Sequence, residues 1–188
     1  MISQGYEANM TQENGSHQQN GIRRPEMESM NVRKPRAMFV NLKNRMHLPG
    51  VNQLIAPCTS HLTASQLKRM LSAWQLMDRY HVFGLIQDGR VIGVVSIEEK
   101  IPGEGRILLI AVLPQQQRRG LGRRMVLESF CTLGLQQLSA ETLPDMAVFY
   151  RKLRFTVGTP RISASGAAIY LCSLSRKELY DAYQHEYS

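Results

Sequence analysis

The chain has 188 residues, of which 43% are hydrophobic and 20% are charged, a composition typical of a single soluble globular domain. Its longest apolar run, residues 107–113, is far shorter than the roughly 20 residues that a membrane-spanning helix needs. Residues 1–30 contain no continuous apolar stretch of the kind that a secretory signal requires. We therefore expect a cytoplasmic protein without a membrane segment.

The net charge of +8 favours a polyanionic partner, but it does not distinguish nucleic acid from a phosphorylated cosubstrate. Three widely spaced cysteines, Cys58, Cys131 and Cys172, form no CxxC pair, so we expect buried, reduced thiols. The histidines have no mutual spacing typical of a metal site. No metal is expected.

Composition divides the chain into three segments. Residues 1–37 are rich in Gln, Asn, Glu, Ser and Gly, so they cannot bury enough apolar surface to offset the entropy of ordering. We predict a flexible N-terminal tail over 1–37, one domain over 38–175, and a C-terminal helical turn or tail over 176–188. The basic cluster at 33–36 is interpreted as a solvated linker.

The first half of the domain is predicted to hold a strand, a helix and a hairpin. A short strand is expected at 38–42, followed by a loop that contains Pro49 and Gly50. Apolar residues at three- and four-residue intervals predict a helix over 63–80, with Thr63 and Gln66 as a capping box. Two β-rich runs on either side of residues 87–90, which include Asp-Gly, predict a hairpin.

The second half alternates strands and helices. Residues 106–114 are apolar on both faces, which is typical of a central strand covered by helices. A helix is expected from 120 to about 133, ended by Gly134, then a strand at 137–142, a helix at 144–153 opened by Pro144, and one or two strands over 161–174. This order predicts an α/β fold in which a mixed central sheet carries helices on both faces.

The segment between the predicted central strand and the next helix indicates a phosphate site. Gly120 and Gly122 lack the β-carbons that would keep a diphosphate away from the unpaired N–H groups of the helix. The guanidinium groups nearby suit phosphate oxygens; they belong to Arg118, Arg119, Arg123 and Arg124. Taken alone, a Gly-x-Gly at such a place is more often only a tight turn.

Two motifs resemble those of a known family. Gln117-x-x-Gly120-x-Gly122 after an apolar strand resembles the acetyl-CoA pyrophosphate loop of the GNAT N-acetyltransferase superfamily. About thirty residues on, AVFYRKLRF at 147–155 resembles that family's FYxKLGF segment. The resemblance covers roughly residues 38–175 and implies the GNAT fold, whose central sheet is mostly antiparallel, with acetyl-CoA as cosubstrate.

The resemblance also implies roles for particular residues. Pantetheine would bind the backbone of the central strand, and the following loop would hold the pyrophosphate. The implied cofactor-binding residues are Ile110, Ala111, Val112, Gln117, Arg118, Arg119, Gly120, Leu121, Gly122 and Arg123. Tyr150 would protonate the leaving thiolate as the general acid.

Two departures from the family pattern affect the predicted site. Arg154 stands where the family usually has glycine, so the turn after the helix must form without that residue. The central strand carries no carboxylate between residues 106 and 114 that could deprotonate the amine. Glu98 and Glu99, at the end of the hairpin, are the best-placed candidate bases, water is the rival, and each glutamate is otherwise a solvated strand end.

The leading prediction is an N-acetyltransferase that moves the acetyl group of acetyl-CoA to a primary amine by direct attack. The alternative is a catalytically weak regulatory module that binds CoA. A nucleic-acid binder ranks last, because the arginines cluster where a diphosphate accounts for them. The expected partners are acetyl-CoA and an amine acceptor, in a monomer or homodimer, and the sequence carries no signature of the acceptor.

Overall fold

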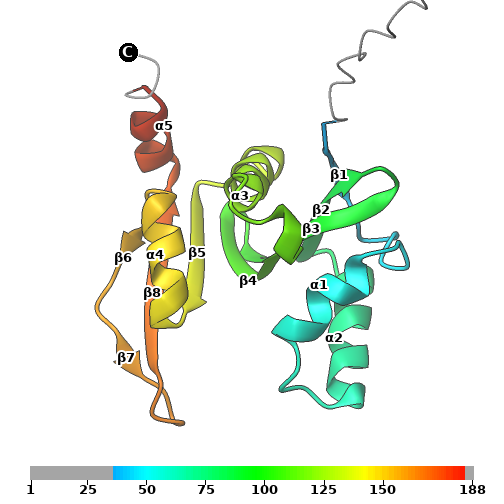
Figure 1. The fold of residues 1–188 in the computed structure, drawn as a ribbon. Helices are drawn as coiled ribbons and strands as arrows, with labels where there is room; N and C mark the ends of the chain where they lie inside the picture. Colours follow the sequence, from blue (N-terminus) through cyan, green and yellow to red (C-terminus); the bar gives the residue numbers. More distant parts are fainter. Residues whose placement is uncertain (1–35, 185–188) are drawn as a thin grey trace, which may run out of the picture. The chain divides into compact units, whose positions relative to one another are not determined.

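The computed structural model describes residues 36–184, so nearly all of the predicted tail lies outside the described residues. Ala37 already belongs to the folded part: it is buried, and its carbonyl accepts a hydrogen bond of 2.7 Å from the Arg124 guanidinium. Figure 1 shows the arrangement of the elements in this part of the chain.

The elements alternate along the chain much as predicted. The strands are β1 (Met38–Asn41), β2 (Tyr80–Gln87), β3 (Arg90–Ile101), β4 (Glu104–Val112), β5 (Gln137–Thr142), β6 (Thr156–Val157), β7 (Arg161–Ile162) and β8 (Ala168–Ser175). The helices are α1 (Val51–Cys58), α2 (Ala64–Leu76), α3 (Leu121–Thr132), α4 (Pro144–Lys152) and α5 (Arg176–Gln184), with a short 3-10 turn η1 (Pro114–Gln116).

The strands form one sheet in the order β1-β2-β3-β4-β5-β8-β6, and β7 pairs with β8. Among the described strands, β4 and β5 make the only parallel pair, because α3 carries the chain back across the sheet between them. The other pairs are antiparallel. The prediction of a mixed, mostly antiparallel sheet is therefore confirmed.

Helices lie on both faces of the sheet. A β-carbon on Gly93 of β3 would stand 3.0 Å from the Met125 side chain of α3, so that face of β3 meets α3. Residues alternate between faces along a strand, and Glu98 therefore faces the other way, together with Tyr80, which lies opposite it on β2. Tyr80 lines a cavity with Trp74 of α2, which places α2 on this second face.

Local sequence signals explain where α2 begins and ends. The Thr63 hydroxyl accepts a hydrogen bond from the backbone N–H of Gln66, while the Gln66 side chain accepts one from the N–H of Thr63. The predicted capping box is confirmed. The predicted end at residue 80 is wrong: Met77 is already extended, with φ −96° and ψ 132°, because Tyr80 begins β2.

Helix α1 lies where the sequence patterns predict only a loop. Val51, Leu54 and Ile55 are buried at helical spacing against β3 and β4. Gly50 starts the helix in the left-handed region, at φ 95°, and Pro57 stands in its last turn. Because glycine and proline are typical of turns, Gly50 and Pro57 made this short amphipathic helix look like a loop in the sequence.

A β-bulge in β4 lies where the sheet begins to split between β4 and β5. The register of β4 against β3 shifts there, since Ser96 pairs with Leu109 whereas the next residue, Ile97, pairs with Ile107. Leu108 is thus the extra residue of the bulge, which bends its strand. This bend helps to position the site.

Beyond the bulge, β4 and β5 no longer pair. Their ladder runs only from Glu104–Ile107 against Gln137–Ala140, and the two strands then part (Figure 1). The Ser139 hydroxyl donates an added bond of 3.3 Å to the Gly105 carbonyl within the paired part. The β5-facing backbone groups of β4 after Ile107 are consequently available for ligands.

Other sequence expectations have mixed outcomes. Cys172 is buried, but Cys58 and Cys131 are exposed, so the expectation of buried thiols was wrong for two of the three cysteines. Within residues 36–184 no group of three or more His, Cys, Asp or Glu residues could hold a metal ion. None of the helices described is both long and apolar enough to cross a membrane.

Candidate active site

Two cavities open where β4 and β5 separate. The larger, about 770 Å³, lies between the end of β4, the loop before α3, and helices α1 and α4. The smaller, about 450 Å³, lies between β4, β5, α2, α4 and the segment after α1. Cys58, Ile110 and Met146 line both cavities, so the two spaces meet beside these residues.

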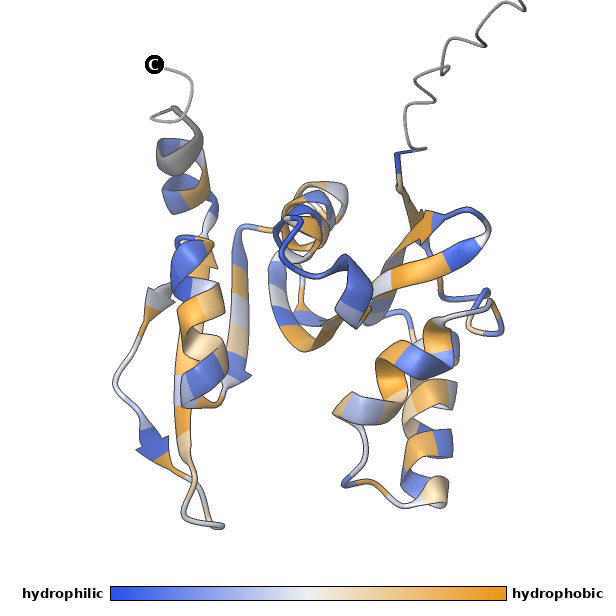
Figure 2. Cartoon of the chain, in the orientation of Figure 1, coloured by the Kyte–Doolittle hydropathy of each residue, from blue (hydrophilic) through white to orange (hydrophobic). Residues whose placement is uncertain are grey.

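The larger cavity is suited to a phosphorylated ligand. Gly120 precedes α3 at φ 73°, and nothing lies within 4 Å of the β-carbon that it lacks. The first N–H groups of α3 have no acceptor within the helix and stand at this end of it. Figure 2 shows a markedly hydrophilic segment between β4 and α3, where the glutamines and arginines are concentrated.

Nine of the ten residues predicted to bind the cofactor line this cavity. They are Ile110, Ala111, Val112, Gln117, Arg118, Gly120, Leu121, Gly122 and Arg123. The tenth, Arg119, is not among the lining residues, and its guanidinium donates a 3.0 Å hydrogen bond to the Gln116 side chain. The Gln117 amide donates to the Val112 carbonyl at 3.0 Å, so this side chain links the loop to the end of β4.

Arg124 has a structural role in place of the phosphate-binding role first considered for it. Its guanidinium forms a 2.5 Å ion pair with Glu128 and donates to the Ala37 carbonyl. It therefore ties α3 to the segment before β1 and lies outside the residues that line the larger cavity.

Gly122 is required for packing as well as for access. A β-carbon at this position would come within 3.1 Å of the Phe149 ring on α4. A bulky residue here would press α3 against the Phe149 ring of α4, so we expect it to disturb the packing of these helices as well as access to the cavity.

Tyr150 lies at the smaller cavity with its hydroxyl unpaired. Its ring is buried and makes edge-on contacts with Phe149 and Phe155, at centroid distances of 5.2 Å and 5.1 Å. Within residues 36–184 the hydroxyl has no hydrogen-bonding partner. Burial, followed by the nearby Cys172, raises the pKa of Tyr150 above its ordinary value, so the phenol stays protonated at neutral pH and has a proton to donate.

The turn after α4 forms despite the missing glycine. Arg154 itself adopts the left-handed conformation, at φ 69°, and its N–H donates to the Arg151 carbonyl at 3.0 Å. The turn therefore forms with a left-handed residue at this position, and because that residue is arginine and not glycine, its backbone is strained.

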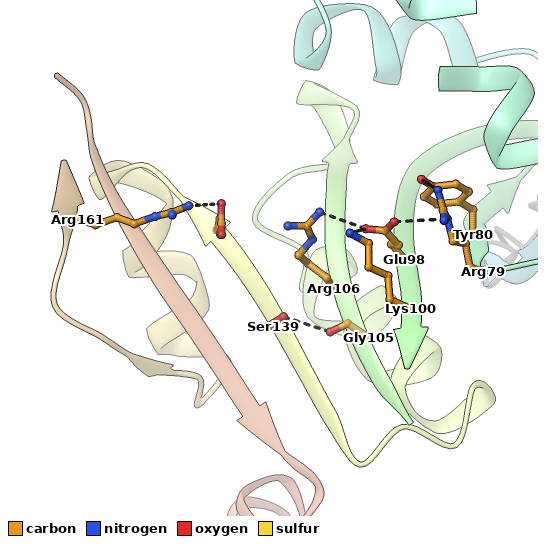
Figure 3. A network of polar contacts seen from close by, with 9 residues as sticks. Arg79, Tyr80, Glu98, Lys100, Gly105, Arg106, Ser139 and Arg161 are labelled. Carbon is orange, nitrogen blue, oxygen red and sulfur yellow. Dashed lines mark hydrogen bonds and ion pairs between the residues drawn. The ribbon is translucent and has the colours of Figure 1, made fainter. Parts of the chain in front are cut away.

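Glu98 does not line either cavity. Its carboxylate is buried and lies near three cationic groups, at 3.1 Å from Arg106, 3.6 Å from Arg79 and 3.8 Å from Lys100. Figure 3 shows these side chains around Glu98: Lys100 comes from the same strand, Arg106 from β4, and Arg79 from the residue before β2, with Tyr80 beside it. The arrangement is that of a structural ion network.

Glu99 is also engaged elsewhere. Its carboxylate lies 3.1 Å from the His81 ring and accepts a 2.7 Å bond from the Gly103 N–H at the β3–β4 turn. It lines neither cavity. The geometry brings Tyr150 and the cofactor loop to connected spaces and leaves both candidate bases outside them.

Several residues of the smaller cavity were missed by sequence reasoning. Glu141, at the end of β5, is the one carboxylate among its described lining residues, and Trp74 and Tyr80 form part of its wall. A sequence signal existed for Glu141, since it precedes the FYRKLRF segment at the end of a strand that borders the split. Trp74 and Tyr80 lie within the apolar pattern from which the helix over 63–80 was predicted, and no role in a site was predicted for them.

Comparison with known proteins identifies the family. Residues 78–157 match the family model described as an acetyltransferase (GNAT) domain. This match shows a GNAT acetyltransferase domain, an acyltransferase domain, in this part of the chain, and acetyl-CoA is the cosubstrate characteristic of that family. This confirms the resemblance seen in the loop and FYRKLRF motifs.

Solved structures share the fold. A GNAT-family protein from Desulfovibrio desulfuricans is 21% identical with a TM-score of 0.59, over 74% of this chain and 98% of that one. A GNAT acetyltransferase from Elizabethkingia anophelis with acetyl-CoA bound is 13% identical with a TM-score of 0.57, over 76% and 99%. An IAA acetyltransferase from Bacillus cereus is 16% identical with a TM-score of 0.55, over 74% and 99%. No curated protein sequence matches the chain.

Proposed function

We propose that the protein transfers the acetyl group of acetyl-CoA to a primary amine by direct attack of the amine on the thioester. The observation that carries this proposal is the meeting of the two cavities beside Cys58, Ile110 and Met146. A cosubstrate in the larger cavity and an acceptor in the smaller one would approach each other there. Such positioning removes much of the entropic barrier of a bimolecular reaction.

The larger cavity is proposed as the acetyl-CoA site. Its fit rests on the unpaired backbone of β4 beyond Ile107, the open approach at Gly120 and the N-terminal end of α3. Arg118 and Arg123 would add positive charge for the diphosphate. When bound, acetyl-CoA supplies an acyl group activated as a thioester.

Tyr150 is proposed as the general acid. As the amine nitrogen bonds to the carbonyl carbon and the carbon–sulfur bond breaks, its unpaired hydroxyl would donate a proton to the leaving sulfur. The raised pKa of Tyr150 supports this role, because the hydroxyl keeps its proton throughout the neutral range.

Water is the better-supported acceptor of the amine's proton. Glu98 is surrounded by cations and Glu99 is held by His81 and the Gly103 N–H. The sequence-based expectation that one of these glutamates is the base stays a prediction, and the geometry offers it no support.

Direct attack competes with a two-step route through an acetylated thiol. Cys58 is the nucleophilic side chain that lines both cavities. Although Cys58 is exposed as a residue, partial desolvation of its thiol raises the thiol pKa, which reduces the fraction of reactive thiolate and disfavours such an intermediate.

Initial-rate kinetics with acetyl-CoA and a panel of primary amines test the proposal. We expect release of free thiol that depends on the amine, intersecting double-reciprocal plots, and retention of most activity in Cys58→Ala. Parallel plots together with an acetylated Cys58 in the mass spectrum would refute direct attack. Tight CoA binding without turnover on any amine would instead support the regulatory module.

A further inference from the structure

The smaller cavity has a charge pattern that discriminates among amines. Glu141 is the one carboxylate among the described residues that line it, and no lysine or arginine is found among them. This contrasts with the net charge of +8 for the whole chain. A primary alkylamine is protonated near pH 7, because such amines have a pKa of about 10. The cavity therefore offers a single counter-charge to an incoming ammonium group.

The rest of the wall suits an apolar, ring-sized body. Trp74, Tyr80, Leu108 and Met146 line the cavity, and the last two are partly exposed apolar side chains that a ligand would cover. Burying such surface is favourable, and an ammonium close to aromatic rings gains a further attraction. The volume of about 450 Å³ falls within the roughly 300–1,000 Å³ typical of small-molecule sites.

Glu141 is already paired at the rim of the cavity. The Arg161 guanidinium on β7, labelled in Figure 3, lies 2.8 Å from one Glu141 carboxylate oxygen. The side chains of Arg161 and Glu141 are 67% and 41% exposed. An exposed pair of this kind is only weakly stabilising, so an ammonium group can share or displace it. A second ammonium on the same acceptor would find no other carboxylate among the described lining residues, and Arg161 would repel it.

From this arrangement we infer that the acceptor is a small primary monoamine carried on an apolar, ring-sized body, bound through its ammonium group by Glu141. Diamines, polyamines and multiply charged amino sugars are disfavoured by the same charge pattern. This inference rests on the proposed function, because it assigns the acceptor of that reaction, but amine binding can be measured without any transfer of acetyl groups.

The sequence contains a single tryptophan, Trp74, whose fluorescence can report ligands in this cavity. With CoA present, we expect 2-phenylethylamine to change the emission saturably, at a concentration about tenfold or more below that needed for 2-phenylethanol, which has the same ring but no charge. 1,5-Diaminopentane should bind more weakly than 2-phenylethylamine. These comparisons use the unaltered protein and need no variant to fold.

Two variants then test Glu141 itself. Glu141→Gln should weaken 2-phenylethylamine about tenfold and leave 2-phenylethanol unchanged, whereas the control Asp88→Asn, which removes a carboxylate at the β2–β3 turn, should change neither. Arg161→Gln should tighten amine binding by up to about fivefold, because it removes the competing cation.

Equal binding of the amine and the alcohol, or tighter binding of the diamine, would overturn the inference. So would an unchanged amine affinity in folded Glu141→Gln. If 2-phenylethylamine binds as expected but is not acetylated, the acceptor pocket is supported and the proposed reaction fails, so the two failures are distinguishable.

Discussion

Replacing Tyr150 by phenylalanine removes one oxygen from the proposed active site and little else. The ring is held by edge-on contacts with Phe149 and Phe155, which the substitution retains. Because the hydroxyl has no hydrogen-bonding partner within residues 36–184, its loss should alter the free energy of unfolding by less than about 1 kcal/mol. Any large effect on turnover must then come from the lost proton donor.

The expected size of that effect follows from the role. A positioned general acid typically contributes about 10²- to 10⁴-fold, so kcat should fall by about two orders of magnitude or more. The affinity for CoA should stay nearly constant, since Tyr150 lines the smaller cavity and not the larger one. The burial-raised pKa also predicts that ionisation of Tyr150 causes no loss of kcat below about pH 10.

The assay combines steady-state rates at saturating amine with calorimetry of CoA binding. Tyr170→Phe on β8 is a matched control, because Tyr170 lines neither cavity and should leave kcat unchanged. An unimpaired kcat in Tyr150→Phe would refute the assignment. Loss of CoA binding would show that the tyrosine is structural.

Three further substitutions test other parts of the site. Gly122→Val should abolish CoA binding in calorimetry and also lower Tm by several degrees, because its side chain meets Phe149 at the 3.1 Å approach; unchanged CoA affinity would mean that the phosphate site is misplaced. Arg154→Gly should raise the free energy of unfolding by up to about 1 kcal/mol, since φ is 69°, and a lower Tm would contradict this. Glu98→Gln should lower the free energy of unfolding by about 1–3 kcal/mol, measured by denaturant unfolding. If water is the base, neither Glu98→Gln nor Glu99→Gln should change the pH profile of kcat. A changed profile would show that a glutamate is the base.

Local sequence patterns predicted most of the fold because their causes are local. The capping box at Thr63 and the Asp88-Gly89 turn act over a few residues and can be read without knowing what surrounds them. Helix α1 was not predicted, because its eight residues include Pro57 and follow a glycine. Its packing against β3 and β4, which stabilises it, cannot be recognised from a local pattern.

The two halves of the proposed site also differ in how far the sequence could predict them. The residues proposed to bind the cofactor lie on one continuous stretch from Ile110 to Arg123, so a motif could indicate them. The acceptor half draws Trp74, Tyr80 and Glu141 from α2, β2 and β5, which are brought together only by the sheet. The sequence prediction considered carboxylates on the central strand and the hairpin. The carboxylate that lines the smaller cavity, Glu141, lies instead on β5.

The bulge at Leu108 affects how this protein can lose function through mutation. Beyond Ile107, β4 does not pair with β5, and the main-chain groups on that edge are present whatever side chains the strand carries. Exchanging one apolar residue for another along β4 can therefore alter packing but cannot delete those groups. Removing a single residue near Leu108 would restore a regular register with β3 and allow β4 to keep pairing with β5. We therefore expect a deletion of one residue there to disturb the split between β4 and β5 more than an exchange of one apolar residue for another in the same strand.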